Sequence, residues 1–132
     1  MKNYIFDSSV LISFFDKEKN AYAIASVLKE INRKNYNPII SVINLGEVYY
    51  HFLKTSDKLT ADTVIDKFIG LNFIIMDIDW GLTRIAATFK SKHKMSYADT
   101  FAAALCKVSE GILITSDKEF LSLEKEIKIN FL

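Results

Sequence analysis

The chain has 132 residues, and half of them are hydrophobic, including ten Phe and six Tyr. This is enough apolar material for one stable core, so we expect residues 1–132 to form a single domain. The single cysteine, Cys106, excludes an internal disulfide, and no His/Cys cluster has the spacing of a zinc site. The 17 basic and 16 acidic residues nearly cancel and leave a net charge of +1. Many nucleic-acid-binding proteins, in contrast, are clearly basic.

No apolar run has the length of a signal peptide or of a membrane-spanning helix, so we expect a cytoplasmic protein without a membrane partner. The chain begins with a predicted buried strand over residues 4–6, which ends at Asp7. Helical spacing of apolar residues follows over 10–15 and 21–35. The turn signal of Asn37 and Pro38 then leads into a second strand, over 38–42.

Helices are expected next over 44–53 and 60–71, followed by a third apolar run of strand length over 73–76. Two further helices, over 82–89 and 97–108, are separated by a lysine-rich linker. The linker and the helix end before it carry Lys90, Lys92, His93 and Lys94. This run of charge is typical of a solvated face, and contact with phosphate is the alternative.

A fourth strand is expected over 111–114, before a short helix near Phe120 and Leu121. Residues 127–131 alternate apolar and polar side chains, which predicts a final edge strand. Short apolar strands that alternate with helices indicate an α/β fold. We therefore predict a central, mostly parallel sheet of four to five short strands with helices on both faces.

Two aspartates follow predicted strands of this sheet, and two more acids lie in the first turns of predicted helices. Asp7 follows the first strand, and Asp117 follows the fourth after two small hydroxyl residues. Ligands of open parallel sheets bind outside the carboxyl ends of the strands. Glu47 and Asp99 begin apolar helices, and alanines that follow Asp99 allow another backbone to pack close to its carboxylate.

A cluster of carboxylates has a chemical meaning, because like charges at close range raise one another's pKa and destabilise the fold unless a cation lies among them. Mg²⁺ and Mn²⁺ prefer oxygen ligands. Such ions polarise a phosphoryl oxygen and acidify a bound water, which is what phosphodiester hydrolysis needs. The simpler interpretation is that each acid serves its own helix. Asp7 would be an N-cap, and Asp117 would interact with a helix dipole. Three pairs have capping-box spacing or a close variant of it: Asn44 with Glu47, Ser96 with Asp99, and Ser116 with Glu119.

Four segments in order resemble PIN-domain ribonucleases. They read YIFDSSVLI (4–12), SVINLGEV (41–48), YADTFAAA (97–104) and LITSDKEF (113–120). Each segment alone is a weak signal, whereas the ordered set spans nearly the whole chain. By size the chain is similar to the VapC-type toxins of toxin–antitoxin pairs.

The resemblance implies a PIN-like fold and an endoribonuclease that depends on Mg²⁺ or Mn²⁺. Asp7, Glu47, Asp99 and Asp117 would be the catalytic, metal-binding acids. It also implies an RNA substrate cut to 5′-phosphate and 3′-hydroxyl ends, a homodimer, and inhibition by a small antitoxin protein. Ser9 and Ser116 would support the acids by orienting them or a water, although backbone capping is the alternative for both serines. Ser9 stands where many members carry Asn.

Two other functions compete with this prediction. The first is phosphotransfer through an aspartyl phosphate on Asp7, although phosphatases of that kind have a second Asp two residues later, where this chain has Ser9. The second is a PIN-like module without catalytic activity that serves as a binding or scaffold module. The intact set of four acids argues against it. Asp77 and Asp79 also follow a predicted strand, and we interpret them as a solvated turn.

Overall fold

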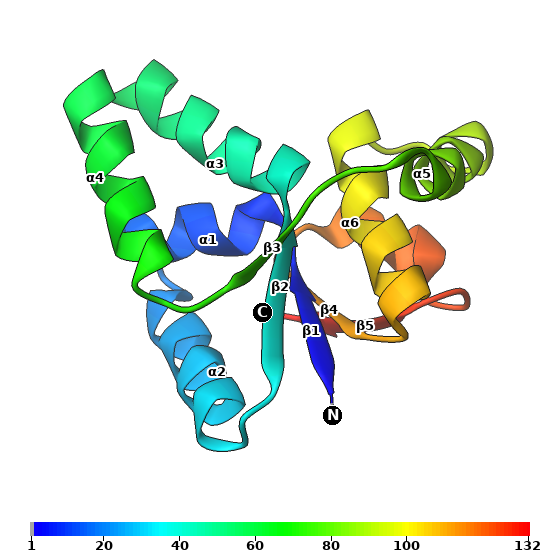
Figure 1. Ribbon diagram of the computed structural model, residues 1–132, viewed down its shortest axis with the longest axis horizontal. Coiled ribbons are helices and arrows are strands. Elements are labelled where there is room, and N and C mark those ends of the chain that lie inside the picture. Colours follow the sequence, from blue (N-terminus) through cyan, green and yellow to red (C-terminus); the bar gives the residue numbers. More distant parts are fainter. Residues whose placement is uncertain (1) are drawn as a thin grey trace.

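Five parallel strands form one sheet in the order β3-β2-β1-β4-β5 (Figure 1). The structure is a computed structural model that describes residues 2–132. The strands are β1 (Asn3–Phe6), β2 (Asn37–Ser41), β3 (Ile74–Met76), β4 (Ile112–Thr115) and β5 (Lys128–Phe131). The C-terminal alternation therefore does form a fifth, edge strand, as predicted.

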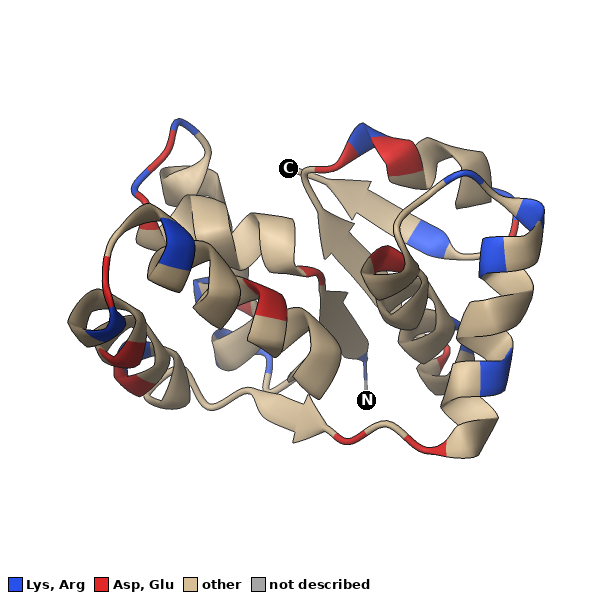
Figure 2. Ribbon diagram, turned by 90° about the horizontal axis from the view of Figure 1, so that it is seen from above, with Lys and Arg blue, Asp and Glu red and all other residues tan. Residues whose placement is uncertain are grey.

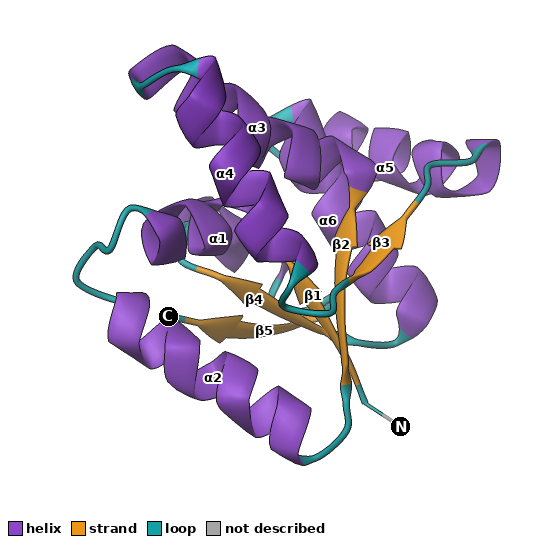
Figure 3. Ribbon diagram, turned by 60° about the vertical axis from the view of Figure 1, so that its left-hand side comes forward, coloured by secondary structure: helices purple, strands orange, loops and turns teal. Residues whose placement is uncertain are grey.

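Helices cover both faces of the sheet (Figures 1 and 3). One side carries the first four, which are α1 (Ser8–Phe15), α2 (Ala21–Arg33), α3 (Val42–Thr55) and α4 (Lys58–Ile69). The other side carries α5 (Trp80–Lys92), α6 (Tyr97–Ser109) and the 3₁₀ helix η1 (Lys118–Leu123). Within residues 2–132, no helix combines the length and the apolarity that a membrane crossing needs.

The core divides along the pleat of the strands, because successive residues of a strand point to opposite faces. Ile5 and Leu113 pack against α5 and α6, whereas their neighbours Phe6 and Ile114 pack with α1 and α2. Ile40 of β2 joins a third group with α1, α3 and α4. Strands that are buried on both faces explain why the sequence shows continuous apolar runs.

Several helices begin earlier than the sequence pattern predicted, because polar side chains cap them. Ser41 accepts a hydrogen bond from the Asn44 amide, so α3 begins at Val42 and not at residue 44. Asp57 and Asp79 cap α4 and α5 in the same way. Asp79 is therefore a helix cap and not only part of a solvated turn.

Two glycines provide a test of this packing. A Cβ on Gly111, directly before β4, would lie 2.6 Å from Ile5 Cδ1 and 2.7 Å from the Asn3 carbonyl oxygen. We expect Gly111→Ala to lower the free energy of unfolding by about 1–3 kcal/mol in chemical denaturation, because the core has no room for the methyl group.

Gly46→Ala is the matched control, because nothing lies within 4 Å of a Cβ on this residue of α3. An alanine there should stabilise the protein by about 0.5–1 kcal/mol. Equal effects of the two substitutions would contradict the close approach of β1 and β4 at Gly111.

Candidate active site

The carboxyl ends of β1 and β4 lie side by side at the centre of the sheet, where Phe6 pairs with Ile114. The chain runs outward from β1 through β2 to β3 and then returns to β4 on the other side of β1. The strand order reverses between β1 and β4, which is where open α/β sheets bind their ligands. Asp7 follows β1, and Asp117 lies two residues beyond Thr115, the last residue of β4.

Asp7 is almost fully buried and performs two tasks. Its Oδ1 caps α1 by accepting from the Val10 amide at 3.3 Å, and it also accepts from Ser9 Oγ at 2.7 Å. Its Oδ2 accepts from Thr115 Oγ1 at 2.6 Å. Burial raises the pKa of Asp7 to about 6 despite these hydrogen bonds, and the nearby charge of Asp117 adds to the rise. The predicted capping role of Asp7 is therefore real and coexists with a place at the site.

Thr115 joins two of the acids, and the sequence analysis missed it. Its buried hydroxyl donates to Asp7 and accepts from the Asp117 amide at 3.0 Å. Thr115 is the first of the two hydroxyl residues that precede Asp117, and of these two the sequence predicts a supporting role for Ser116 alone. A buried threonine at the end of a central strand was the available signal, since a buried hydroxyl needs a partner.

Asp99 lies in the first turn of α6, and only 8% of its surface is exposed. Its backbone amide donates to Ser96 Oγ at 3.1 Å, so the predicted Ser96 cap is present. Burial, together with the charges of the other three acids, raises the pKa of Asp99 to about 7. These three are Asp7, Asp117 and Glu47. The four predicted acids therefore lie close enough for their charges to act on Asp99, and the space beside its carboxylate is the candidate site.

Glu47, on α3, accepts two side-chain hydrogen bonds, both on the same carboxylate oxygen. Its Oε1 accepts from Ser8 Oγ at 3.0 Å and from Asn44 Nδ2 at 3.1 Å. Ser8 directly follows Asp7 in the chain, so this contact ties the second acid to the first. The N-cap of α3 is Ser41, and the predicted capping box of Asn44 with Glu47 is therefore wrong.

Asp117 is half-buried and caps η1, with its Oδ1 accepting from the Glu119 amide at 2.9 Å. Carboxylate oxygens of Asp99, Asp117 and Glu119 all lie within 4.8 Å of one another. The sequence predicts Glu119 only as the partner of a Ser116 cap. That cap is wrong because Asp117 takes its place, and Glu119 is an acid of the cluster that the sequence analysis missed.

The two predicted supporting serines lie in one hydrogen-bonded chain. Ser9 Oγ donates to Asp7, and it accepts from Ser116 Oγ at 3.1 Å and from the Ser116 amide at 3.3 Å. Ser9 therefore contacts an acid directly, whereas Ser116 reaches it only through Ser9. Neither serine serves as the N-cap of a helix.

This donor set suits a hard divalent cation. The side chains that face the space are carboxylates with oxygen ligands, which Mg²⁺ and Mn²⁺ prefer. Within residues 2–132, no basic side chain forms an ion pair with Asp7 or Asp99, and burial raises the pKa of both acids. A cation would remove this electrostatic penalty.

Two side chains of the basic run, Lys90 and His93, make contacts away from the four acids. Lys90 donates to the Met95 carbonyl, and His93 Nε2 lies 2.7 Å from Glu126. Figure 2 shows basic and acidic positions interspersed on that side of the sheet. These contacts favour the interpretation of this run as a surface feature.

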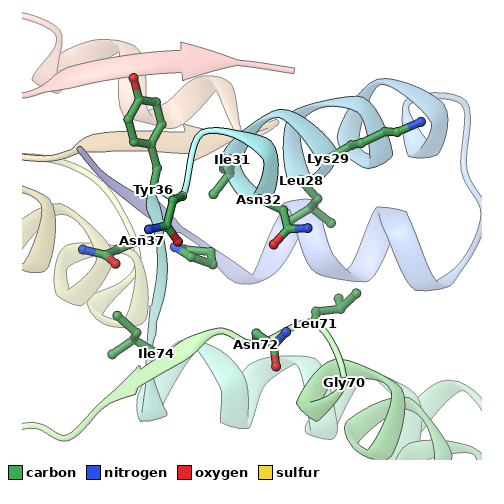
Figure 4. A pocket seen from close by; sticks show the side chains of 12 residues that line it. Leu28, Lys29, Ile31, Asn32, Tyr36, Asn37, Gly70, Leu71, Asn72 and Ile74 are labelled. Carbon is green, nitrogen blue, oxygen red and sulfur yellow. The ribbon is translucent and has the colours of Figure 1, made fainter. Parts of the chain in front are cut away.

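A separate hollow of about 500 Å³ lies at the opposite ends of the strands, between α2 and the turn before β3 (Figure 4). Leu28, Ile31, Pro38 and Leu71 contribute apolar surface, and Asn72 lies among them. None of the four acids lines this hollow. It is therefore distinct from the acidic site.

The pKa values predict how the metal-free protein responds to pH. Between the ordinary pKa of 3.8 and the folded values of about 6 for Asp7 and about 7 for Asp99, the folded state binds more protons than the unfolded state. The free energy of unfolding in EDTA should therefore fall as pH rises from 5 to 8. Asp99→Asn should remove part of this fall and raise the melting temperature at pH 8, by about 3–5 °C per kcal/mol regained.

The matched control is Asp66→Asn, an exposed acid on α4, which should leave the pH dependence unchanged. Thermal and chemical unfolding at several pH values measure the effect. A stability that rises from pH 5 to pH 8 would contradict the assigned burial of Asp7 and Asp99.

Comparison with known proteins places this arrangement in a family. Solved structures share the fold over nearly the whole chain at low sequence identity. VapBC2 from Rickettsia felis, solved with a DNA fragment from its promoter, gives a TM-score of 0.82 at 16% identity, covering 98% of both chains. DNA-bound VapBC from Salmonella typhimurium gives 0.77 at 17% identity, covering 99% of this chain and 98% of that chain.

VapC20 from Mycobacterium tuberculosis, described as a toxin that cleaves the sarcin-ricin loop, gives a TM-score of 0.68 at 11% identity, covering 83% of this chain and 86% of that one. A comparison with proteins of curated function finds no match. Residues 4–126 match the family described as the PIN domain. The chain therefore belongs to the PIN domain family.

Proposed function

We propose that this protein is an endoribonuclease that depends on Mg²⁺ or Mn²⁺ and hydrolyses RNA phosphodiester bonds. The observation that carries the proposal is the convergence of Asp7, Glu47, Asp99 and Asp117 from four different elements on one space. Their mutual charge appears in the raised pKa of Asp99. Membership of the PIN domain family and the fold shared with VapC toxins support it.

Asp99 and Asp117 are the first candidates to hold the cation, and a carboxylate oxygen of Glu119 lies beside theirs. Asp7 and Glu47 would be the other acids of the cation site. A divalent cation held there supplies Lewis-acid chemistry, since it polarises a phosphoryl oxygen and acidifies water. The chain's own task is to hold the carboxylates in fixed positions. Ser9 and Thr115 orient Asp7, while Ser8 and Asn44 orient Glu47.

Phosphotransfer through Asp7 is less well supported. Both of its carboxylate oxygens accept hydrogen bonds, and the residue is only 1% exposed, which obstructs attack on a phosphorus atom. The inactive scaffold alternative is opposed by the presence of all four acids in one place.

We further propose that the chain acts as one domain, as the toxin of a toxin–antitoxin pair, with a small antitoxin protein as its inhibitor. The support is the shared fold, because several similar structures are described as VapBC or toxin–antitoxin complexes. Titration of the active protein with the product of the adjacent gene tests this, and RNA cleavage should stop near a stoichiometric ratio. Unchanged cleavage would contradict the antitoxin proposal alone.

A homodimer is also part of the proposal, and edge strand β3 offers a surface for it. Ile74, Ile75 and Met76 are each 39–42% exposed, and they present apolar side chains on both faces of the edge. The opposite edge strand, β5, carries the polar residues Lys128 and Asn130 on its exposed positions. Polar side chains protect edge strands from pairing, and β3 has none.

Cleavage of a mixed RNA substrate tests the enzyme proposal. We expect Mn²⁺-dependent cleavage that EDTA abolishes and that Asp7→Asn or Asp99→Asn lowers by about 10²–10³-fold, because each removes preorganised charge from the site. Asp66→Asn, on the outer helix α4, should retain full activity. The products should carry 5′-phosphate and 3′-hydroxyl ends.

Residual activity that is equal in the wild type and both site variants would identify a contaminant and favour the scaffold alternative. Products with 2′,3′-cyclic phosphate would exclude hydrolysis by water. A covalent phosphate trapped on Asp7 would favour phosphotransfer.

The oligomeric state tests the β3 surface. Ile75→Lys adds a charge at the exposed edge, so we expect light scattering to show a monomer where the wild type is a dimer. Asn130→Lys on β5 is the matched control and should remain a dimer. A dimeric Ile75→Lys protein, or a monomeric wild type, would contradict this assignment.

A further inference from the structure

Asn44, in the first turn of α3, is completely buried, and its side-chain amide makes three hydrogen bonds. Its Nδ2 donates to Glu47 Oε1 at 3.1 Å and to the Ala98 carbonyl oxygen at 3.2 Å. Its Oδ1 accepts from Ser41 Oγ at 2.7 Å. The side chain thus joins the start of α3, one acid of the site and the residue directly before Asp99.

The chemistry of the amide explains why asparagine suits this place. Two donors and one acceptor on a short side chain are needed, and a single hydroxyl supplies only one donor. Burial of an amide is costly unless its hydrogen bonds are made. Among residues 2–132, every buried side-chain nitrogen or oxygen has a partner, Asn44 included.

Asn44 links the carboxylate of Glu47 to the first turn of α6. Asn44 precedes Glu47 by one helical turn, so its amide lies alongside that carboxylate. Both hydrogen bonds to Glu47, from Asn44 and from Ser8, fall on Oε1, which leaves Oε2 as the oxygen open to a ligand. The second donor of Asn44 reaches α6, the helix that carries Asp99.

We infer that Asn44 is a positioning residue that holds Glu47 against α6, so that Glu47 and Asp99 face the cation together. This inference rests on the proposed function, because it assigns a role within the same cation site. The loss of such an orienting partner typically weakens metal binding by about 10–100-fold.

A double-mutant cycle on Mn²⁺ affinity tests this role without depending on RNA cleavage. Calorimetry compares the wild type, Asn44→Ala, Glu47→Ala and the double variant. Asn44→Ala should raise the Kd for Mn²⁺ by about 10–100-fold in the wild type. It should change the Kd by less than about twofold when Glu47 is already absent, because the two residues act as a unit. Asn32→Ala, an exposed amide on α2, is the control and should bind Mn²⁺ as the wild type does.

Circular dichroism and thermal unfolding check that each variant is folded. Should Asn44→Ala fail to fold, Asn44→Thr, which keeps one donor, replaces it in the same cycle. An equal loss of affinity with and without Glu47 would overturn the positioning role and leave the proposed function intact. A wild type that binds no Mn²⁺ would overturn both.

Discussion

Electrostatic repulsion among partly buried carboxylates is the main constraint on the structure at the carboxyl ends of β1 and β4. Burial and neighbouring charge raise the pKa of Asp7 to about 6 and that of Asp99 to about 7. Thr115 ties Asp7 to the Asp117 backbone, Ser8 ties Glu47 to the residue after Asp7, and Asn44 ties Glu47 to α6. A cation bound among these acids would offset their repulsion and stabilise the fold.

Two of the acids also cap helices, which reconciles interpretations that the sequence presents as alternatives. Asp7 caps α1 through Oδ1, and Asp117 caps η1 through its Oδ1. A carboxylate has two oxygens and several lone pairs, so capping leaves capacity for a ligand. The first turns of α1 and η1 thereby hold Asp7 and Asp117 at the carboxyl ends of β1 and β4.

The sequence was sufficient to predict the fold, because continuous apolar runs and helical spacing identify the strands and helices. It also identified the four acids, which the structure brings together. The sequence did not predict which polar residues support them. Thr115 and Asn44 owe their importance to partners far away in the chain, such as Asp7 and Ala98. Glu119 was assigned to a local cap, and only the position of α6 shows that it lies near Asp99. Helix starts were predicted late where a cap such as Ser41 or Asp79 precedes the apolar pattern.

Diffraction from crystals soaked in MnCl₂ tests the central claim most directly, because manganese is located by its anomalous signal. We expect a peak between the carboxylates of Asp99 and Asp117, with carboxylate oxygens as direct ligands of the ion. The peak should be absent from crystals of the Asp99→Asn variant. Manganese bound only elsewhere on the protein, or a peak that persists unchanged in that variant, would contradict the assignment of this acidic cluster as a cation site.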